Sequence, residues 1–285
     1  MEELIDLHTH TRFSDGELSP EKLIELAKTR NIKTIAITDH DTVNGIKKIR
    51  NLELGNIEVI KGIELSAKAT KGTFHILGYD LDLDSEILNN KMWELKTNST
   101  NSTLSVMEQI KRDYGIRFDY DDIKKLINAN RHIGRPDLAK LCIKYGYATT
   151  PQEAFDKYLN AAHEKIRGLN KWLTYEECLD LIIKSGGIPV LAHPYQLKMT
   201  EEEFIPLLEN MIKCGLRGIE VYHSNHSKEQ MEYYKKIANK YDLLISGGSD
   251  YHGKILKPDI ELGTGKNNNL KLKQLSLVDE IHKRR

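Results

Sequence analysis

Seven short apolar runs, rich in β-branched residues and separated by amphipathic stretches, constrain the fold of this chain more than any other feature. Their lengths are typical of buried strands. Helix-start signals fall between them, such as Ser19-Pro20-Glu21 and Thr174-Tyr175-Glu176-Glu177. Strands that alternate with helices favour a parallel sheet in an α/β fold. The expected strands cover residues 4–7, 34–38, 58–65, 74–79, 188–192, 218–222 and 243–246.

The alternation stops over roughly residues 84–171. Helical patterns replace the strands there, over residues 87–113, 120–129, 136–145 and 150–162, and a polar tract at 98–102 interrupts the first of them. Insertions in α/β barrels commonly overhang the C-terminal face, where active sites lie. We therefore expect a catalytic unit made of residues 1–83 and 172–285, and a helical cap made of residues 84–171.

The composition excludes some function classes. Lys plus Arg and Asp plus Glu each total 42, so no global field would attract a long polyanion or an anionic membrane surface. The chain has no apolar run long enough to span a bilayer, and the first strand leaves no room for a signal peptide. Cys142, Cys178 and Cys214 form no CxxC pair and are expected to be buried thiols. We expect a cytoplasmic protein with no membrane or long nucleic-acid partner.

Histidines and carboxylates gather at the predicted strand ends. His8 and His10, at positions i and i+2 of an extended segment, point to the same face and can reach one cation together. Because the carboxyl ends of barrel strands meet at one rim, side chains distant in sequence converge there. Each unpaired buried polar group costs about 1–3 kcal/mol, so cations would be favourable partners. The other strand-end residues of these types are Asp15, His40, Glu64, His75, His193, Glu220, His223, Asp250 and His252.

Seven motifs at these strand ends are His8-Thr9-His10, Ser14-Asp15-Gly16, Thr38-Asp39-His40-Asp41, Gly62-Ile63-Glu64-Leu65-Ser66, His75-Ile76-Leu77-Gly78-Tyr79, Ala192-His193-Pro194 and Gly248-Ser249-Asp250-Tyr251-His252-Gly253. As a set they resemble the PHP (polymerase and histidinol phosphatase) superfamily of metal-dependent phosphoesterases. The chain is most similar to the bacterial branch that contains 3′,5′-nucleoside bisphosphate phosphatases and 5′-to-3′ exoribonucleases. The resemblance implies a distorted (β/α)7 barrel with a helical insertion capping its C-terminal face.

The resemblance also implies up to three divalent cations per chain. Imidazole and carboxylate ligands without thiolate suit Mn²⁺, Zn²⁺ or Fe²⁺ better than Mg²⁺, and Mn²⁺ is the expected ion. His8, His10, Glu64, His193 and Asp250 are the expected catalytic residues. The implied ligands are His8, His10, Glu64 and Asp250 for one cation, Glu64, His75 and His193 for a second, and Asp15, His40 and His252 for a third.

Neighbouring cations can bind phosphate oxygens, lower the pKa of a shared water and stabilise the leaving oxygen. We expect a metal-bridging hydroxide to attack phosphorus directly, without a phosphoenzyme. The expected substrate is a small phosphorylated nucleotide, hydrolysed at the 3′-phosphate of a nucleoside 3′,5′-bisphosphate, with 5′-to-3′ exonuclease action on short RNA as an extension.

Three residues are candidate substrate contacts. Arg135 precedes a helix, so it could bind a phosphate with two N–H groups, although a solvated loop position is the alternative. His223 and His226 could bind phosphate or protonate the leaving group, and a supporting role is equally open. In the cap, Lys96 to Asn101 replaces the arginine-bearing helix of the resembled branch, so the substrate is less defined than the reaction.

Some alternatives stay open. A histidinol-phosphate phosphatase would use the same chemistry, with an acidic group for the substrate ammonium. A metal-bound regulatory domain without turnover is disfavoured by the near-complete ligand set. Asp6 could orient an imidazole or accept backbone amides, and Glu220 is expected to orient or support its strand end rather than bind a metal. His132, His163 and His282 are assigned no chemistry, and the sequence leaves the oligomeric state open.

Overall fold

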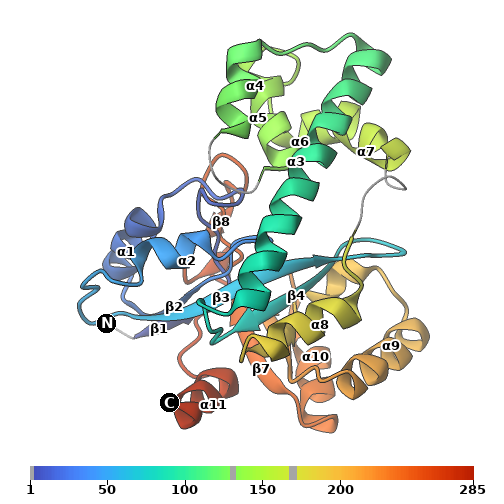
Figure 1. Ribbon diagram of the computed structural model, residues 1–285. Helices are drawn as coiled ribbons and strands as arrows, with labels where there is room; N and C mark the ends of the chain where they lie inside the picture. Colours follow the sequence, from blue (N-terminus) through green and yellow to red (C-terminus); the bar gives the residue numbers. More distant parts are fainter. Residues whose placement is uncertain (1–2, 129–132, 167–171) are drawn as a thin grey trace.

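Seven strands form one sheet that is nearly closed into a barrel, in a computed structural model that describes residues 3–128, 133–166 and 172–285 (Figure 1). The strands follow one another in chain order, and the first and last approach each other where Leu7 N–H donates to Gly247 O at 3.1 Å. All seven predicted strands are confirmed. They are β1 (Leu4–Asp6), β2 (Ile32–Ile37), β3 (Glu58–Ala67), β4 (Phe74–Tyr79), β5 (Ile188–Leu191), β6 (Gly218–His223) and β7 (Leu244–Gly248).

The direction of β4 corrects the expectation of a parallel sheet. β4 runs antiparallel to both β3 and β5, whereas the other neighbouring strands are parallel. The start of β4, rather than its end, therefore lies at the rim where the parallel strands finish. This reversal places His75, the second residue of β4, at the same rim as Glu64.

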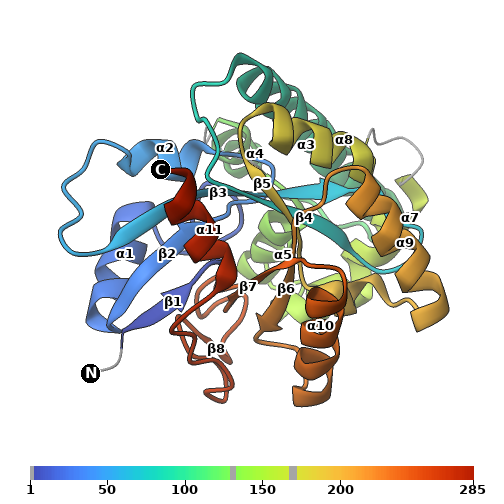
Figure 2. The ribbon, with the colours of Figure 1, turned by 90° about the horizontal axis from the view of Figure 1, so that it is seen from below.

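Helices cover the outside of the barrel, and one lies across its lower end. Capping side chains define their starts: Ser19 accepts from Lys22 N–H, and Thr174 and Glu177 form a capping box. Helix α11 (Ser276–Arg284) packs apolar residues against the barrel interior, as Figure 2 shows from below. The other outer helices are α1 (Pro20–Thr29), α2 (Asn44–Ile49), α8 (Tyr175–Lys184), α9 (Glu201–Lys213) and α10 (Lys228–Lys240).

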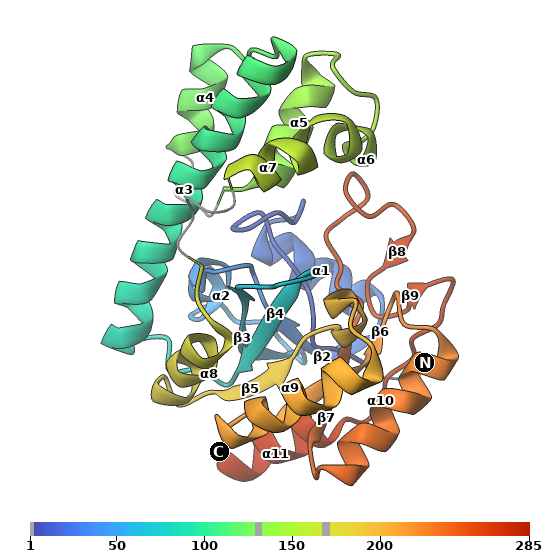
Figure 3. The same cartoon turned by 90° about the vertical axis from the view of Figure 1, so that its right-hand side faces the viewer.

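A group of helices lies over the opposite end of the barrel (Figure 3). They share an apolar core, built around Val106, Ile110, Leu138 and Leu159, that is separate from the barrel cores. The limits 84 and 171 stay a prediction, and residue 171, like His132, lies outside the described residues. The group comprises α3 (Glu86–Tyr114), α4 (Tyr120–Ile127), α5 (Arg135–Lys144), α6 (Pro151–Ala154), a π-helical turn (Phe155–Leu159) and α7 (Asn160–Ile166).

The polar tract at 98–102 does not interrupt α3, so the expected break is wrong. Thr97 and Thr100 hydroxyls donate to the carbonyl oxygens of Trp93 and Lys96, four residues earlier, at 3.0 and 2.9 Å. The Thr103 hydroxyl donates to Ile133 O at 3.2 Å. Because these hydroxyls find partners within the helix or on the neighbouring segment, they do not unwind it.

Two further expectations concern thiols and membranes. Cys142 and Cys178 are buried as expected, whereas Cys214 is exposed, because it follows the last turn of α9 at the surface. Within the described ranges, no helix has both the length and the apolar character needed to span a membrane.

Candidate metal centre

The nine predicted ligand residues come together at the rim of the barrel that faces the cap. They arise from the β1 end and its following loop, the ends of β2, β5 and β7, the middle of β3 and the start of β4. The residues are His8, His10, Asp15, His40, Glu64, His75, His193, Asp250 and His252.

Glu64 is the common neighbour of five imidazoles. Its Oε2 lies 3.2 Å from His8 Nε2, 3.2 Å from His10 Nε2 and 3.1 Å from His40 Nδ1. Its Oε1 lies 2.8 Å from His75 Nδ1 and 2.8 Å from His193 Nε2. The side chain is fully buried. A carboxylate surrounded in this way could help to hold more than one divalent cation, together with the neighbouring imidazoles.

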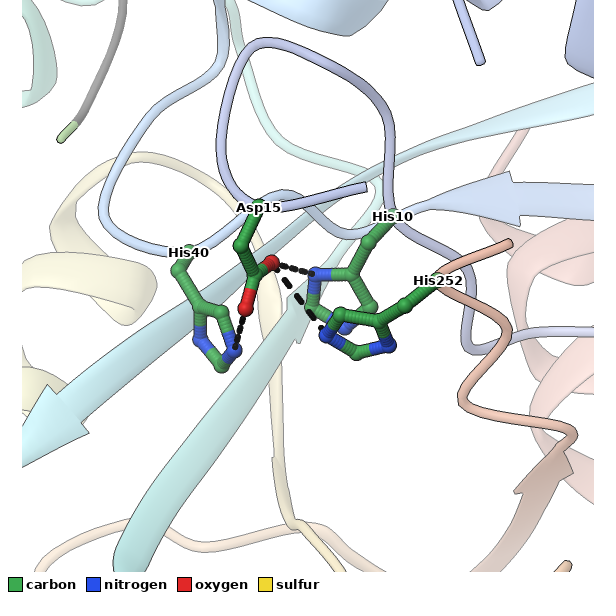
Figure 4. A group of neighbouring side chains, drawn as sticks. All are labelled: His10, Asp15, His40 and His252. Carbon is green, nitrogen blue, oxygen red and sulfur yellow. Dashed lines mark ion pairs between the residues drawn. The ribbon is translucent and has the colours of Figure 1, made fainter. Parts of the chain in front are cut away.

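A second group surrounds Asp15, on the loop after β1 (Figure 4). Asp15 Oδ1 lies 3.2 Å from His252 Nε2 and 3.7 Å from His10 Nδ1, and its Oδ2 lies 3.9 Å from His40 Nε2. Asp39 holds this loop in shape. The Asp39 carboxylate accepts hydrogen bonds from the Thr11 N–H, the Thr11 hydroxyl and the Ser14 hydroxyl, each at 2.7 Å.

Asp250 divides its two oxygens between different neighbours. Oδ1 lies 3.3 Å from His10 Nε2 and 3.3 Å from His252 Nδ1. Oδ2 lies 3.2 Å from His223 Nε2 and accepts a hydrogen bond from Lys257 Nζ at 2.5 Å. The residue adopts a positive φ of 56°, so its placement stores backbone strain at the site.

Glu220 contacts two of the predicted ligand residues, His8 and His193. Its Oε1 lies 2.9 Å from His8 Nδ1, which directs His8 Nε2 towards Glu64. Its Oε2 accepts the His193 backbone N–H at 2.7 Å. Carboxylate partners of this kind fix the ring orientation of metal-binding histidines.

The electrostatics favour ionised acids and several neutral imidazoles. Burial acts to raise the pKa of Glu64, but the surrounding histidines outweigh it and hold that pKa well below the ordinary value. The pKa of Asp250 is held well below its ordinary value by Lys257 and His252 against the effect of burial. Burial lowers the pKa of His40 well below its ordinary value. Carboxylates and neutral imidazoles are the forms that bind metals.

Buried ligand atoms in this cluster lack hydrogen-bond partners among the described residues. They include His8 Nε2, His10 Nε2, His40 Nδ1, Asp15 Oδ1 and Glu64 Oε2. Leaving such atoms unpaired is costly, and divalent cations would satisfy them together. Three sets have ligand atoms within 4.8 Å of one another: His8, His10 and Glu64; His40, Glu64 and His75; and His10, Asp15, His40 and His252.

These groups fit divalent cations, but their membership differs in detail from the set implied by the family resemblance. His40 belongs to two groups, with Glu64 and with Asp15. Asp250 and His193 lie beside these groups: Asp250 contacts His10, and His193 contacts Glu64. The assignment of individual ligands to individual cations therefore stays a prediction.

A cavity of about 300 Å³ connects this centre with the cap. Its barrel side is lined by Asp15, His40 and His75, and its cap side by Arg135 and Phe155. The Arg135 guanidinium lies 6.0 Å from the Phe155 ring centroid, and its Nη1 donates to Asn160 Oδ1 at 3.3 Å. Arg135 and three of the predicted ligands therefore line the same cavity, where the guanidinium could contact a bound anion.

The two other candidate substrate contacts lie deeper. His223 is fully buried beside Asp250, and His226 is buried with its Nδ1 donating to Val221 O at 2.8 Å. Neither residue lines the described cavity walls beside the centre. Their position favours the supporting role that the sequence left open, and direct substrate contact stays a prediction.

Sequence reasoning missed two residues of this region. Lys257 contacts Asp250 and lines a larger cavity over the centre, although nothing in its local pattern marks it. Trp172, where the chain returns from the cap to the barrel, lines the 300 Å³ cavity. The only sequence signal for Trp172 was its position between the predicted cap and the barrel.

Curated relatives share most of their length with this chain. A 5′-3′ exoribonuclease of Haemophilus influenzae is 29% identical over 97% of this chain and 96% of its own. A phosphoribosyl 1,2-cyclic phosphate 1,2-diphosphodiesterase of Eggerthella lenta is 29% identical over 87% and 94%. A 3′,5′-nucleoside bisphosphate phosphatase of Chromobacterium violaceum is 27% identical over 87% of each chain.

A solved structure agrees with the fold. A protein of Bifidobacterium adolescentis, described as a metal-dependent phosphoesterase, superposes with a TM-score of 0.78 at 28% identity, over 99% of this chain and 96% of its own. The PHP domain family matches residues 6–255, which includes all nine predicted ligands. The chain therefore belongs to the PHP domain family and is a metal-dependent phosphoesterase with a distorted (β/α)7 barrel fold.

Proposed function

We propose that this protein removes the 3′-phosphate from nucleoside 3′,5′-bisphosphates. The observation that carries the proposal is the position of Arg135 across one cavity from Asp15, His40 and His75. A substrate with two phosphates could place one at the metal-binding groups and the other at the guanidinium, which binds phosphate through paired N–H groups. The bisphosphate phosphatase of Chromobacterium violaceum supports this substrate class.

We also propose that the site holds up to three divalent cations, with Mn²⁺ as the native ion. Bound cations would neutralise phosphate charge and lower the pKa of the attacking water. The ligands proposed are the nine residues predicted from the sequence. Glu220 would keep His8 Nε2 directed at the centre, and Lys257 would hold Asp250 with Oδ1 facing His10.

The cap, residues 84–171 in our proposal, would limit the substrate to a short molecule. Its helices place Arg135 and Phe155 opposite the metal-binding groups. The chain carries no net charge, so a long polyanion would find no general attraction. Trimming of short 5′-phosphorylated RNA would use the same groups.

Histidinol phosphate fits the cavity less well. Its ammonium group would need a free carboxylate near the phosphate site. Asp137 lines the cavity, but it is buried and accepts the Gly134 N–H at 3.0 Å. The basic Arg135 occupies the neighbouring position. This arrangement favours a substrate with a second negative group.

A substrate panel tests the proposal. Protein with Mn²⁺ is given adenosine 3′,5′-bisphosphate, a 5′-phosphorylated RNA oligonucleotide, phosphoribosyl 1,2-cyclic phosphate and histidinol phosphate, and the products are quantified. We expect the bisphosphate to give the highest kcat/KM, with adenosine 5′-monophosphate and phosphate as products. A clear preference for one of the other three would overturn the substrate assignment, and no turnover of any by fully metallated protein would favour a regulatory role.

Arg135 is tested with matched substrates. Arg135→Met should raise KM for adenosine 3′,5′-bisphosphate about 10-fold or more, because a charged hydrogen bond contributes roughly 1.5–3 kcal/mol. The same variant should leave KM for adenosine 3′-monophosphate nearly unchanged. Arg112→Met, on the last turn of α3, is the control. Equal changes in KM for both substrates would show that Arg135 does not recognise the 5′-phosphate.

A further inference from the structure

A second, smaller cavity adjoins the one over the metal-binding groups. Its volume is about 120 Å³, against about 300 Å³ for the larger one. Both are bordered by Ser66, Gly134, Arg135, His163 and Trp172. Ligand cavities usually measure roughly 300–1,000 Å³, so the smaller one is suited to one part of a ligand that extends from the larger.

The walls of the small cavity combine an aromatic ring with polar side chains. Trp172 is 37% exposed, and the His163 ring meets it edge-on at 6.0 Å. Helix α3 contributes Asn98 and Ser102 from its polar tract, together with the apolar Leu95. Among the described residues, no hydrogen bond engages the Asn98 amide or the Ser102 hydroxyl. The amide supplies a donor and an acceptor, and the hydroxyl can serve as either.

Trp172 is held in place through its backbone neighbour. Leu173 pairs with Ala67 at the end of β3, and its carbonyl oxygen accepts the Lys68 N–H at 2.7 Å. The Trp172 ring therefore belongs to a segment that is fixed to the barrel at Ala67. Ala67 follows Glu64 by three residues in β3. A rigid, partly exposed aromatic ring beside hydrogen-bonding side chains is the arrangement that recognises a flat heterocycle.

We propose that this small cavity, lined by Trp172, His163, Leu95, Asn98 and Ser102, binds the nucleobase of the substrate. The base would stack on Trp172, and Asn98 and Ser102 would contact its edge. The sugar and phosphates would then extend past Arg135 to the metal-binding groups. This inference rests on the proposed function, because it assumes a nucleotide substrate. It also gives a role to the polar tract of α3.

Tryptophan fluorescence tests binding without turnover. The chain has two tryptophans, and Trp93 is 72% exposed and lines neither cavity, so Trp93→Phe leaves Trp172 as the only indole. Adenosine 5′-monophosphate should quench the fluorescence of this variant saturably. Ribose 5-phosphate, which lacks the base, should not. Equal responses to the two ligands, or none to either, would overturn the proposal.

Kinetics separates base recognition from catalysis. Trp172→Ala should raise KM for adenosine 3′,5′-bisphosphate about 10-fold, the size expected from loss of base stacking, and change kcat little. Trp172→Phe should retain most of the affinity. Hydrolysis of 1-deoxyribose 3,5-bisphosphate, which has no base, should not respond to Trp172→Ala. Trp93→Ala is the control, and an unchanged KM for Trp172→Ala would contradict the proposal.

The two hypotheses fail separately. If the protein releases the 3′-phosphate but Trp172→Ala leaves KM unchanged, the base site is wrong and the proposed function stands. If Trp172 fluorescence responds to adenosine 5′-monophosphate but not to ribose 5-phosphate, while no nucleotide loses phosphate, the base site stands and the proposed function is wrong.

Discussion

At the scale of single residues, Glu64 has to satisfy five imidazoles with two oxygens. All five imidazole nitrogens lie 2.8–3.2 Å from these oxygens. A neutral, protonated acid carries an O–H group on one oxygen, so it could not accept from all of them. Its neighbours hold its pKa well below the ordinary value in spite of burial. An ionised carboxylate between facing imidazoles is the electrostatic centre of the site, and two groups of ligand atoms include it.

Replacing this carboxylate should remove metal. In Glu64→Gln the amide presents an N–H₂ group to the histidine nitrogens, so we expect loss of bound metal and a fall in kcat/KM of more than about 100-fold. Glu220→Gln should cost about 10–100-fold, because it weakens the support of His8 and of the His193 backbone but leaves Glu64 in place. Elemental analysis of metal and a phosphate-release assay measure both effects. Full metal content in Glu64→Gln would contradict this assignment.

His226 should make the folded state sensitive to mild acid. Burial, with a smaller contribution from His223, lowers its pKa to about 3. The unfolded chain, with a pKa of about 6.5, binds the proton more readily, so stability is complete above pH 6.5 and is lost as the pH falls towards 3. The loss should approach about 1.4 kcal/mol per pH unit.

The variant His226→Asn tests this sensitivity. Its side-chain amide can still donate to the Val221 carbonyl oxygen, as the imidazole Nδ1 does, but it does not titrate. Urea unfolding of metal-free protein between pH 6.5 and 5 should show a steeper loss of stability in the parent protein than in the variant. Parallel pH profiles for the two proteins would refute the effect.

At the scale of secondary-structure elements, Asp6 joins the first strand to the segments after the last one. Its Oδ1 accepts from Ser249 N–H at 2.8 Å, and its Oδ2 accepts from the Ser249 hydroxyl at 2.6 Å and from Gly263 N–H at 2.8 Å. Of the two roles left open by the sequence, these contacts show the second, acceptance of backbone amides. Asp6 therefore closes the barrel close to His8 and Asp250.

Asp6→Asn should weaken this closure. Its amide group would face the hydrogen-bond donors of Gly263 or Ser249, and a buried unsatisfied group costs about 1–3 kcal/mol. Ser249→Ala, which removes one hydrogen bond of the same set, should cost only about 1 kcal/mol. Urea titration of the free energy of unfolding compares the two. A smaller loss for Asp6→Asn than for Ser249→Ala would show that Asp6 does not have this role.

The elements themselves could be predicted because their signals are local. Strand periodicity and helix-start signals such as Thr174-Tyr175-Glu176-Glu177 predicted the barrel elements without knowledge of their partners. The direction of β4 could not be predicted in this way, because strand pairing depends on the link between β3 and β4. His75 shows the consequence: its place at the start of its strand suits a ligand only after β4 is reversed.

Contacts between elements were the least predictable part of the site. The contact of Lys257 with Asp250 and the position of Trp172 depend on how loops fold over the barrel. The orientation of His223 and His226 depends on side chains packed from several strands and loops. The predicted ligand residues, in contrast, could be found because the motifs that contain them resemble those of the PHP family, and most of them follow strand ends that share one rim.

At the scale of the whole molecule, metal binding should stabilise the fold. Cations that bind only the folded chain raise its stability by about 2.7 kcal/mol at 100 times Kd. Asp250 and Glu64, acting against burial, raise the pKa of His10 to about 9, so a proton must leave when a cation binds. Affinity for Mn²⁺ should therefore rise between pH 7 and pH 9. Calorimetric titration measures this, and an affinity independent of pH would contradict it.

We propose that the barrel, the cap and the cavity between them form one reaction chamber. The barrel supplies the metal-binding groups, and the cap supplies Arg135. The two units are joined through α3 and through Leu173, which pairs with Ala67. The barrel and the cap together would therefore determine where the substrate phosphates bind.

The decisive experiment is phosphorus-31 NMR of adenosine 3′,5′-bisphosphate after hydrolysis by the Mn²⁺-loaded protein, in samples quenched with excess EDTA so that Mn²⁺ does not broaden the phosphate resonances. We expect the 3′-phosphate resonance to disappear, inorganic phosphate to appear in equal amount, and the 5′-phosphate resonance to persist as that of adenosine 5′-monophosphate. Loss of the 5′-phosphate first, or an unchanged spectrum with fully metallated protein, would contradict this expectation.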